Sequence, residues 1–136
     1  MNFLSIETST NICSVTLFIN SKVHITKKQI TEEHSKYLPV FTDQLIKKNK
    51  LDYIALSIGP GSFTGLKISS SFSKGLAYAL DIPIVPIDTF EGIRTQLPND
   101  NQYYIAMYSH RDYAFSAFYN NESKNYQYKC NKISDL

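Results

Sequence analysis

Three glycines, Gly59, Gly61 and Gly65, lie between an apolar run and a segment with helical periodicity. A glycine-rich turn that leads into a helix often binds phosphate, because the first amides of the helix lack partners within it. The spacing fits neither common phosphate motif: the P-loop position five residues before Gly65 holds Pro60, and the dinucleotide fingerprint needs two residues between its last glycines where this sequence has three. The residues leave open a phosphate cradle or a plain strand-to-helix turn.

A second candidate anion site is the polar turn that follows the first apolar run. It contains Glu7, Thr8, Ser9 and Thr10, whose hydroxyls and backbone amides are expected at one edge of a sheet. If both turns bound phosphate, the chain would be a small nucleotide-dependent transferase or hydrolase, and this is the alternative to the interpretation developed below.

Composition sets the class of protein. The chain has 136 residues, of which 43% are hydrophobic, and a net charge of +2, which fits one globular unit and does not indicate nucleic-acid binding. Cys13 and Cys130 have no metal-ligand spacing, so we expect reduced thiols and no metal site. No Ser/His/Asp or Cys/His arrangement indicates a nucleophile. The N-terminus has no signal peptide or membrane span, so the expected location is the cytoplasm.

The pattern of apolar residues predicts an α/β protein that begins with a β-meander. Strands are predicted at 2–7, 12–19 and 22–30, with a hairpin turn at Asn20 and Ser21, and then at 52–58 and 82–87. Helices are predicted at 32–48, with Thr31 as N-cap and a kink at Pro39, at 62–80, capped by Ser62 or Thr64, and from Asp88 onward. These predicted elements define a first unit at 1–97.

After residue 97 the character of the sequence changes, and 98–136 is predicted to begin a second lobe. A hairpin is expected from strands at 102–109 and 113–120, followed by a strand at 125–129. Seven of the ten tyrosines lie in this part. Tyrosine can stack on bases, but it is also a favoured strand residue.

The stretch SIGPGSFTGLK, at 57–67, closely resembles the signature of the TsaB (YeaZ) family. Three further stretches resemble that family in the same order: LSIETST, EEHSKYLPVFTDQL and IPIVPIDTFEGI. The resemblance covers nearly all of 1–120. Its signature turn contains Gly59, Pro60, Gly61, Ser62, Phe63, Thr64, Gly65 and Lys67.

The resemblance implies an actin-like, Hsp70-like (ASKHA, ribonuclease H-like) lobe, with a mixed sheet and helices packed on it. It also implies a non-catalytic scaffold subunit that pairs with the transferase TsaD and the ATPase TsaE in threonylcarbamoyl-adenosine modification of tRNA. The chain would reach tRNA only through that complex, would bind no cofactor tightly although the complex uses ATP, and would form a homodimer when alone. Relatives exceed two hundred residues, so we expect the second lobe to be truncated.

Two departures from the family's relatives concern chemistry. The catalytic relative binds a metal through two histidines at i and i+4, whereas here His34 is followed by Leu38. Actin-like phosphate turns use Asp and Gly where this chain has Glu7 and Ser9, and family members commonly carry Arg at the position of Lys67. The missing second histidine argues against a metal site, and the residues at 7, 9 and 67 weaken the expectation of nucleotide binding at what we regard as a degenerate phosphate turn.

The functional surface is expected on the helices at 32–48 and 62–80, which could form a four-helix interface with a pair from another subunit. Small residues along the second helix allow close approach of its backbone. The sequence does not separate core from interface residues. The predicted interface residues are Tyr37, Leu38, Phe41, Leu45, Ile68, Phe72 and Leu76.

Overall fold

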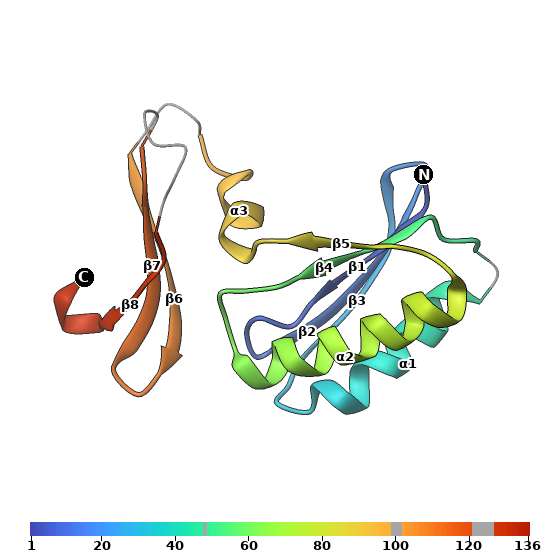
Figure 1. Ribbon diagram of the computed structural model, residues 1–136, viewed down its shortest axis with the longest axis horizontal. Coiled ribbons are helices and arrows are strands. Elements are labelled where there is room, and N and C mark those ends of the chain that lie inside the picture. The colour runs from blue at the N-terminus through green and yellow to red at the C-terminus, as the bar shows by residue number, and fades with distance from the viewer. Residues whose placement is uncertain (48, 99–101, 121–126) are drawn as a thin grey trace.

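The computed structural model describes residues 1–47, 49–98, 102–120 and 127–136 (Figure 1). A five-stranded sheet in the order β3-β2-β1-β4-β5 lies at the centre of the first part of the chain. β1 (Phe3–Glu7), β2 (Ile12–Ile19) and β3 (Lys22–Ile30) form an antiparallel meander, while β4 (Tyr53–Ser57) and β5 (Ile84–Ile87) continue the sheet in parallel with β1. The predicted meander and the mixed sheet are confirmed.

Local sequence explains the hairpin between β2 and β3. Asn20 and Ser21 both have positive φ, 52° and 61°, which gives the turn a backbone twist that matches the right-handed twist of the strands. The bounds of both strands agree with the prediction.

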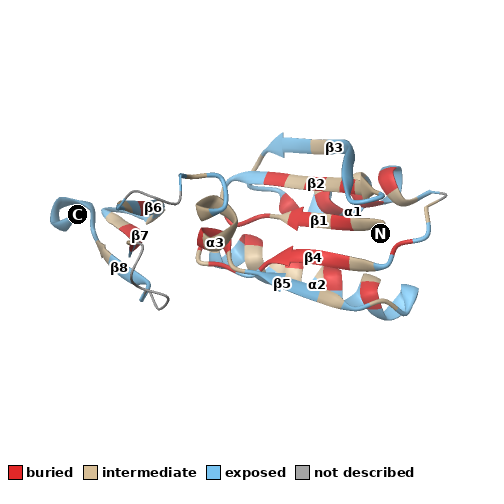
Figure 2. Cartoon of the chain, turned by 90° about the horizontal axis from the view of Figure 1, so that it is seen from above, coloured by how far each residue is buried: buried red, intermediate tan, exposed pale blue. Residues whose placement is uncertain are grey.

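Two helices cover one face of this sheet, α1 (His34–Ile46) and α2 (Phe63–Leu80) (Figure 1). Alternate residues of the strands point toward them, so Leu4 and Ile6 of β1 are buried against Leu38 and Leu45 of α1. α2 buries a stripe of small residues instead: Gly65, Ser69, Ser73 and Ala77. Because small side chains take up little depth, α2 lies close to the elements beneath it. Figure 2 shows the buried positions concentrated along β1, β2 and β4.

The opposite face of the sheet has no covering helix in the described residues, and aromatic rings pack on it. The ring of Phe3 stacks on Phe18 at 4.3 Å and on Tyr53 at 4.5 Å between centroids. The three residues are neighbours across β1, β2 and β4. Cross-strand aromatic pairs of this kind stabilise a sheet face that remains partly in water.

The start of α1 differs from the prediction. Thr31 is not the N-cap: its Oγ1 accepts a hydrogen bond from the amide of Glu33 at 2.8 Å, and the helix begins three residues later, at His34. Glu32 and Glu33, which the predicted bounds of 32–48 placed in the first turn, precede the helix, so that part of the prediction is wrong. Pro39 lies inside α1, as predicted.

Three other strands are shorter than expected, since the predicted 2–7, 52–58 and 82–87 are found at 3–7, 53–57 and 84–87. Asp88 is the N-cap of α3 (Thr89–Arg94), as predicted, and accepts from the amides of Phe90 and Glu91 at 2.9 and 3.0 Å. α2 ends at Leu80, and Asp81, the C-cap that follows, has a left-handed φ of 53°.

A separate three-stranded sheet contains β6 (Tyr103–His110), β7 (Tyr113–Tyr119) and β8 (Lys129–Lys132). The predicted hairpin is confirmed, but the strand expected at 125–129 is found at 129–132, and positions 125 and 126 lie outside the described residues. This sheet has its own buried cluster, in which Phe90 of α3 packs with Ile105, Ala117 and Tyr119. The division at residue 97 stays a prediction.

Candidate functional site

The parallel strands β1, β4 and β5 end at the same edge of the first sheet, and their last residues bring together side chains that are far apart in sequence. Glu7 ends β1, Ser57 ends β4 and Asp88 follows β5. Ligand sites in α/β sheets commonly lie outside the carboxyl ends of the strands. This edge is therefore the first place to look for a site.

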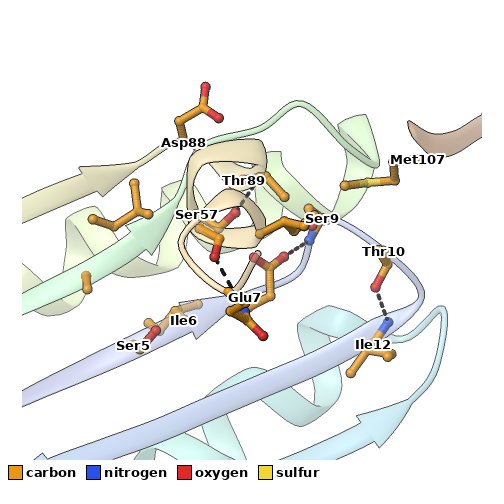
Figure 3. Close-up of a pocket in the computed structure, with 15 residues that line it drawn as sticks. Ser5, Ile6, Glu7, Ser9, Thr10, Ile12, Ser57, Asp88, Thr89 and Met107 are labelled. Atoms are coloured by element: carbon orange, nitrogen blue, oxygen red, sulfur yellow. Dashed lines mark hydrogen bonds between the residues drawn. The ribbon is translucent and has the colours of Figure 1, made fainter. Parts of the chain in front are cut away.

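A cleft of about 390 Å³ lies at this edge, against α3 and β6 (Figure 3). Ser57 Oγ and Thr89 Oγ1 are 2.7 Å apart and share a hydrogen bond. The residues that line the cleft are Ser5, Ile6, Glu7, Ser9, Thr10, Ile12, Ala55, Ser57, Ile87, Asp88, Thr89, Gly92, Ile93, Gln96 and Met107. Two carboxylates and no lysine or arginine belong to this lining, so the electrostatics oppose a phosphate group.

The two turns that the sequence offered as anion sites bind each other. Thr8 Oγ1 donates to the carbonyl oxygen of Gly65 at 2.9 Å, and the amide of Ser62 donates to the carbonyl oxygen of Ser9 at 2.6 Å. The amide of Ser9 donates to Oε1 of Glu7 at 2.5 Å. The amides of Ser9 and Ser62, which could have served a phosphate, are therefore used within the protein.

Glycine is required at two points of this contact for reasons of space. A Cβ on Gly65 would lie 2.1 Å from the carbonyl oxygen of Thr8, and a Cβ on Gly61 would lie 2.5 Å from the carbonyl oxygen of Ser9. Gly59, with φ of 108°, has a backbone conformation that L-residues rarely adopt. The signature glycines thus allow the end of β1 and the start of α2 to touch.

Ser62 is the N-cap of α2, one of the two predicted candidates. Its side chain accepts from the amide of Gly65 at 3.2 Å, while Thr64 lies within the first turn. Phe63, the first residue of the helix, is 78% exposed, and Nζ of Lys67 lies 5.7 Å from its ring centroid. The exposed part of the signature turn is therefore a hydrophobic and cationic surface.

His34 is buried at the start of α1, close to the joined turns. A Cβ on Gly65 would lie 3.3 Å from its Cδ2 and Nε2 atoms, and its Nδ1 has no hydrogen-bond partner among the described residues. From the sequence, His34 stood out only as a histidine without a second metal ligand four residues on, where Leu38 lies. Within the same described ranges, no group of three or more His, Cys, Asp or Glu side chains could hold a metal ion.

Asp88 connects the first sheet to the second. Oδ1 caps α3, and Oδ2 accepts a hydrogen bond from the hydroxyl of Tyr128, whose ring packs edge-on against Phe90 at 5.5 Å. Burial, followed by the hydrogen bond to Asp88, raises the pKa of Tyr128, so the hydroxyl stays a donor. The sequence predicts the cap, but it gives no sign of the hydrogen bond between Asp88 and Tyr128, which are forty positions apart.

The predicted interface residues divide into two groups. Leu38 and Leu45 face the sheet, with only 0% and 4% of their surface exposed, and they belong to the core. The remaining five are half-buried at the edge of that core: Tyr37, Phe41, Ile68, Phe72 and Leu76. A fully buried side chain cannot contact a partner, so the interface prediction continues with the second group alone.

Both cysteines are free, as expected; Cys13 is buried in β2 and Cys130 is exposed in β8. Burial raises the pKa of the Cys13 thiol to about 11, which keeps it protonated at neutral pH. Neither thiol lines the cleft. Within the described residues, no helix combines the length and the apolar character needed to cross a membrane.

Comparison with known proteins identifies the family. The profile of the family described as TsaD, tRNA N6-adenosine threonylcarbamoyltransferase, matches residues 20–119. The TsaB protein of Haemophilus influenzae, a tRNA threonylcarbamoyladenosine biosynthesis protein, is 34% identical over 92 residues, which cover 64% of this chain and 39% of that protein. The TsaB protein of Escherichia coli is 32% identical over 94 residues, which cover 65% and 41%. The chain thus spans about two fifths of the length of these curated relatives.

Solved structures agree on the fold. YeaZ from Pseudomonas aeruginosa superposes with a TM-score of 0.72 at 23% identity, over 94% of this chain and 64% of that one. A second Pseudomonas aeruginosa structure, described as similar to peptidase YeaZ, gives a TM-score of 0.79 at 20% identity, over 99% and 68%. The expected actin-like fold class is confirmed. The chain therefore belongs to the TsaB/YeaZ family of TsaD-like proteins.

Proposed function

We propose that this chain is a non-catalytic subunit in the formation of threonylcarbamoyl-adenosine in tRNA. In this role it pairs with a TsaD-type transferase and, within the same assembly, with TsaE. It reaches tRNA through that assembly rather than by its own contacts. Family membership supports the pathway, because the curated TsaB relatives carry the name of that biosynthesis.

The observation that carries the non-catalytic part is the contact between the two turns. The hydroxyl of Thr8 donates to the carbonyl oxygen of Gly65, and the amide of Ser62 donates to the carbonyl oxygen of Ser9. The lining of the neighbouring cleft contains the carboxylates of Glu7 and Asp88 and no lysine or arginine. Such a site offers little to a nucleotide phosphate. The alternative, a nucleotide-dependent transferase or hydrolase of the same fold, has no observation in its favour here.

The partner surface in this proposal is the outer side of α1 and α2. Tyr37, Phe41, Ile68, Phe72 and Leu76 are half-buried there and could gain burial against a second pair of helices. A matching pair comes either from the TsaD-type subunit or, in its absence, from a second copy of this chain.

Complementation tests the proposal. A bacterial strain depleted of its own TsaB is supplied with this chain, and the threonylcarbamoyl-adenosine content of its tRNA is measured by nucleoside mass spectrometry. We expect the modification to be restored. A Gly75→Arg variant should fail, because the arginine projects from the exposed side of α2, where a Cβ meets no atom within 4 Å, and should block docking without disturbing the fold.

Two controls sharpen the result. A Thr95→Arg variant places the same side chain at an exposed position directly after α3. This variant should restore the modification as the wild type does. Circular dichroism shows whether each variant is folded. Failure of the folded wild type to restore the modification in the presence of the TsaD-type subunit of its own source would contradict the proposal.

A further inference from the structure

β3 forms one edge of the five-stranded sheet, and within the described residues it pairs only with β2. It has nine residues, more than any other strand in that part of the chain, and eight of them are exposed. Figure 2 shows this exposed strand along the outside of the sheet. Every second residue of an edge strand turns its backbone N–H and C=O groups away from the sheet. β3 therefore offers a row of backbone donors and acceptors to a further strand.

A bulge divides β3 into an irregular start and a regular remainder. His24 is the extra residue, because two steps along β3, from Val23 to Ile25, match a single step along β2. A bulge bends its strand and interrupts pairing on both sides. From Ile25 to Ile30, by contrast, the register with β2 is unbroken. A further strand can therefore follow β3 over residues 25–30.

β3 is rich in lysine and contains no acidic residue. Its lysines are Lys22, Lys27 and Lys28. Lys27 lies opposite Val15, which is buried in the core. Lys28 lies opposite Ser14 and therefore on the other face of the sheet. In the described part of the chain, neither Lys27 nor Lys28 forms an ion pair. Two neighbouring ammonium groups thus stand at the edge, one on each face.

This charge pattern discriminates between possible occupants of the edge. A second copy related by a two-fold axis would place β3 against β3, so the lysines of both copies would converge. Like charges on paired strands oppose association. Edge lysines are a common protection against such unwanted pairing, but they do not oppose a strand with carboxylates at the matching positions. Opposite charges across the pair would instead add to the backbone hydrogen bonds.

From these observations we infer that the β3 edge binds an extended acidic segment of a different protein as a sixth strand of the sheet. The backbone of this segment hydrogen-bonds to residues 25–30, and two adjacent carboxylates, one on each face, pair with Lys27 and Lys28. Ile25 and Ile30, which are 41% and 72% exposed, gain apolar contacts at the two ends of this stretch. The edge contains none of the residues proposed above for subunit docking, so the inference goes beyond the proposed function and does not depend on it.

A synthetic strand tests the inference on the full chain. The probe is a ten-residue peptide of alternating valine and threonine, with two adjacent glutamates at its centre and both ends blocked. NMR titration measures its affinity, and hydrogen exchange followed by NMR locates its binding. We expect slower amide exchange at residues 25–30 when the peptide is bound. Glutamine in place of both glutamates should weaken binding about tenfold at about 50 mM NaCl, and methylation of the peptide's backbone nitrogens should abolish the protection.

Charge reversal of the chain supplies matched variants. Lys27→Glu/Lys28→Glu should bind the glutamate peptide about tenfold more weakly than the wild type does. A peptide with two lysines in place of its glutamates should bind this variant and restore the protection, which separates lost pairing from lost folding. The control is Lys129→Glu/Lys132→Glu, which makes the same change of net charge at exposed positions of β8. This control should bind the glutamate peptide within about threefold of the wild type.

Several results would overturn the inference. Unchanged exchange at residues 25–30 with the peptide in large excess, or protection that survives backbone methylation, would rule out strand addition. Equal binding of the glutamate and glutamine peptides would rule out recognition of acidic residues. Protection that rises with the concentration of the chain alone, together with self-association in sedimentation velocity, would make a second copy the occupant. None of these results bears on the complementation assay, so the inference and the proposed function fail separately.

Discussion

Thr8 Oγ1 donates a hydrogen bond to the carbonyl oxygen of Gly65 across 2.9 Å, and so joins the end of β1 to the first turn of α2. The two residues are fifty-seven positions apart. The signature glycines leave room for this contact, and the contact supports the non-catalytic role that we propose for the chain.

Gly65→Ala should destabilise the fold while Gly75→Ala should not, although both change the same helix. The new methyl group at 65 would lie 2.1 Å from the carbonyl oxygen of Thr8, whereas at 75 it meets open space. We expect a loss of about 1–3 kcal/mol in the free energy of unfolding at 65 and a gain of about 0.5–1 kcal/mol at 75. Urea denaturation measures both, and equal effects would refute the close contact.

Ser62→Ala should cost about 1 kcal/mol of stability, because it removes the acceptor for the amide of Gly65. Thr64→Ala, in the first turn of the same helix, should stay within about 0.5 kcal/mol. The comparison uses the same denaturation assay. A larger cost at Thr64 would show that the helix is capped by the other predicted candidate.

Leu38→Ala should destabilise by about 2–5 kcal/mol, since Leu38 is fully buried between α1 and the sheet. Tyr78→Ala should leave stability within about 0.5 kcal/mol, because the side chain is exposed, yet it should weaken binding of the TsaD-type subunit. Calorimetric binding and thermal unfolding separate the two effects. A stable Leu38→Ala protein would contradict the assignment of this residue to the core.

A thiol reagent at pH 8 should modify Cys130 rapidly and Cys13 only after unfolding. Cys130 is exposed, while burial raises the pKa of Cys13 to about 11 and lowers its thiolate fraction. The folded pKa lies above the ordinary value of 9.0, so this thiol favours folding below pH 9 and loses that contribution as pH rises toward 11. Rapid modification of two thiols per native chain would argue against the buried position.

The sequence predicted the strands best where local and tertiary signals agree. The strands at 12–19 and 22–30 have β-branched residues and a turn that tolerates positive φ, and their bounds agree with the prediction. The start of α1 was predicted wrongly because the hydroxyl of Thr31 accepts a hydrogen bond from the amide of Glu33, two residues later. This bond forms a local turn, which competes with helix capping by the same side chain.

Two features of the candidate site could not be predicted from local sequence. The contact between Thr8 and Gly65 depends on where the strands place two distant turns, and no spacing rule describes it. Helical periodicity finds an apolar side of α1, but it does not say which apolar side meets the sheet, so Leu38 and Phe41 looked alike. The cleft could have been predicted from the sequence, because Glu7 and Asp88 lie at the carboxyl ends of predicted strands, and these strands are parallel in the sheet.

The most direct test of the central claim is light scattering coupled to size exclusion on a mixture of this chain and the TsaD-type subunit from the same source. The account predicts a stable complex of the two proteins that Gly75→Arg abolishes and Thr95→Arg preserves. Elution of the folded wild-type chain apart from the TsaD-type subunit, at every concentration and salt used, would contradict it.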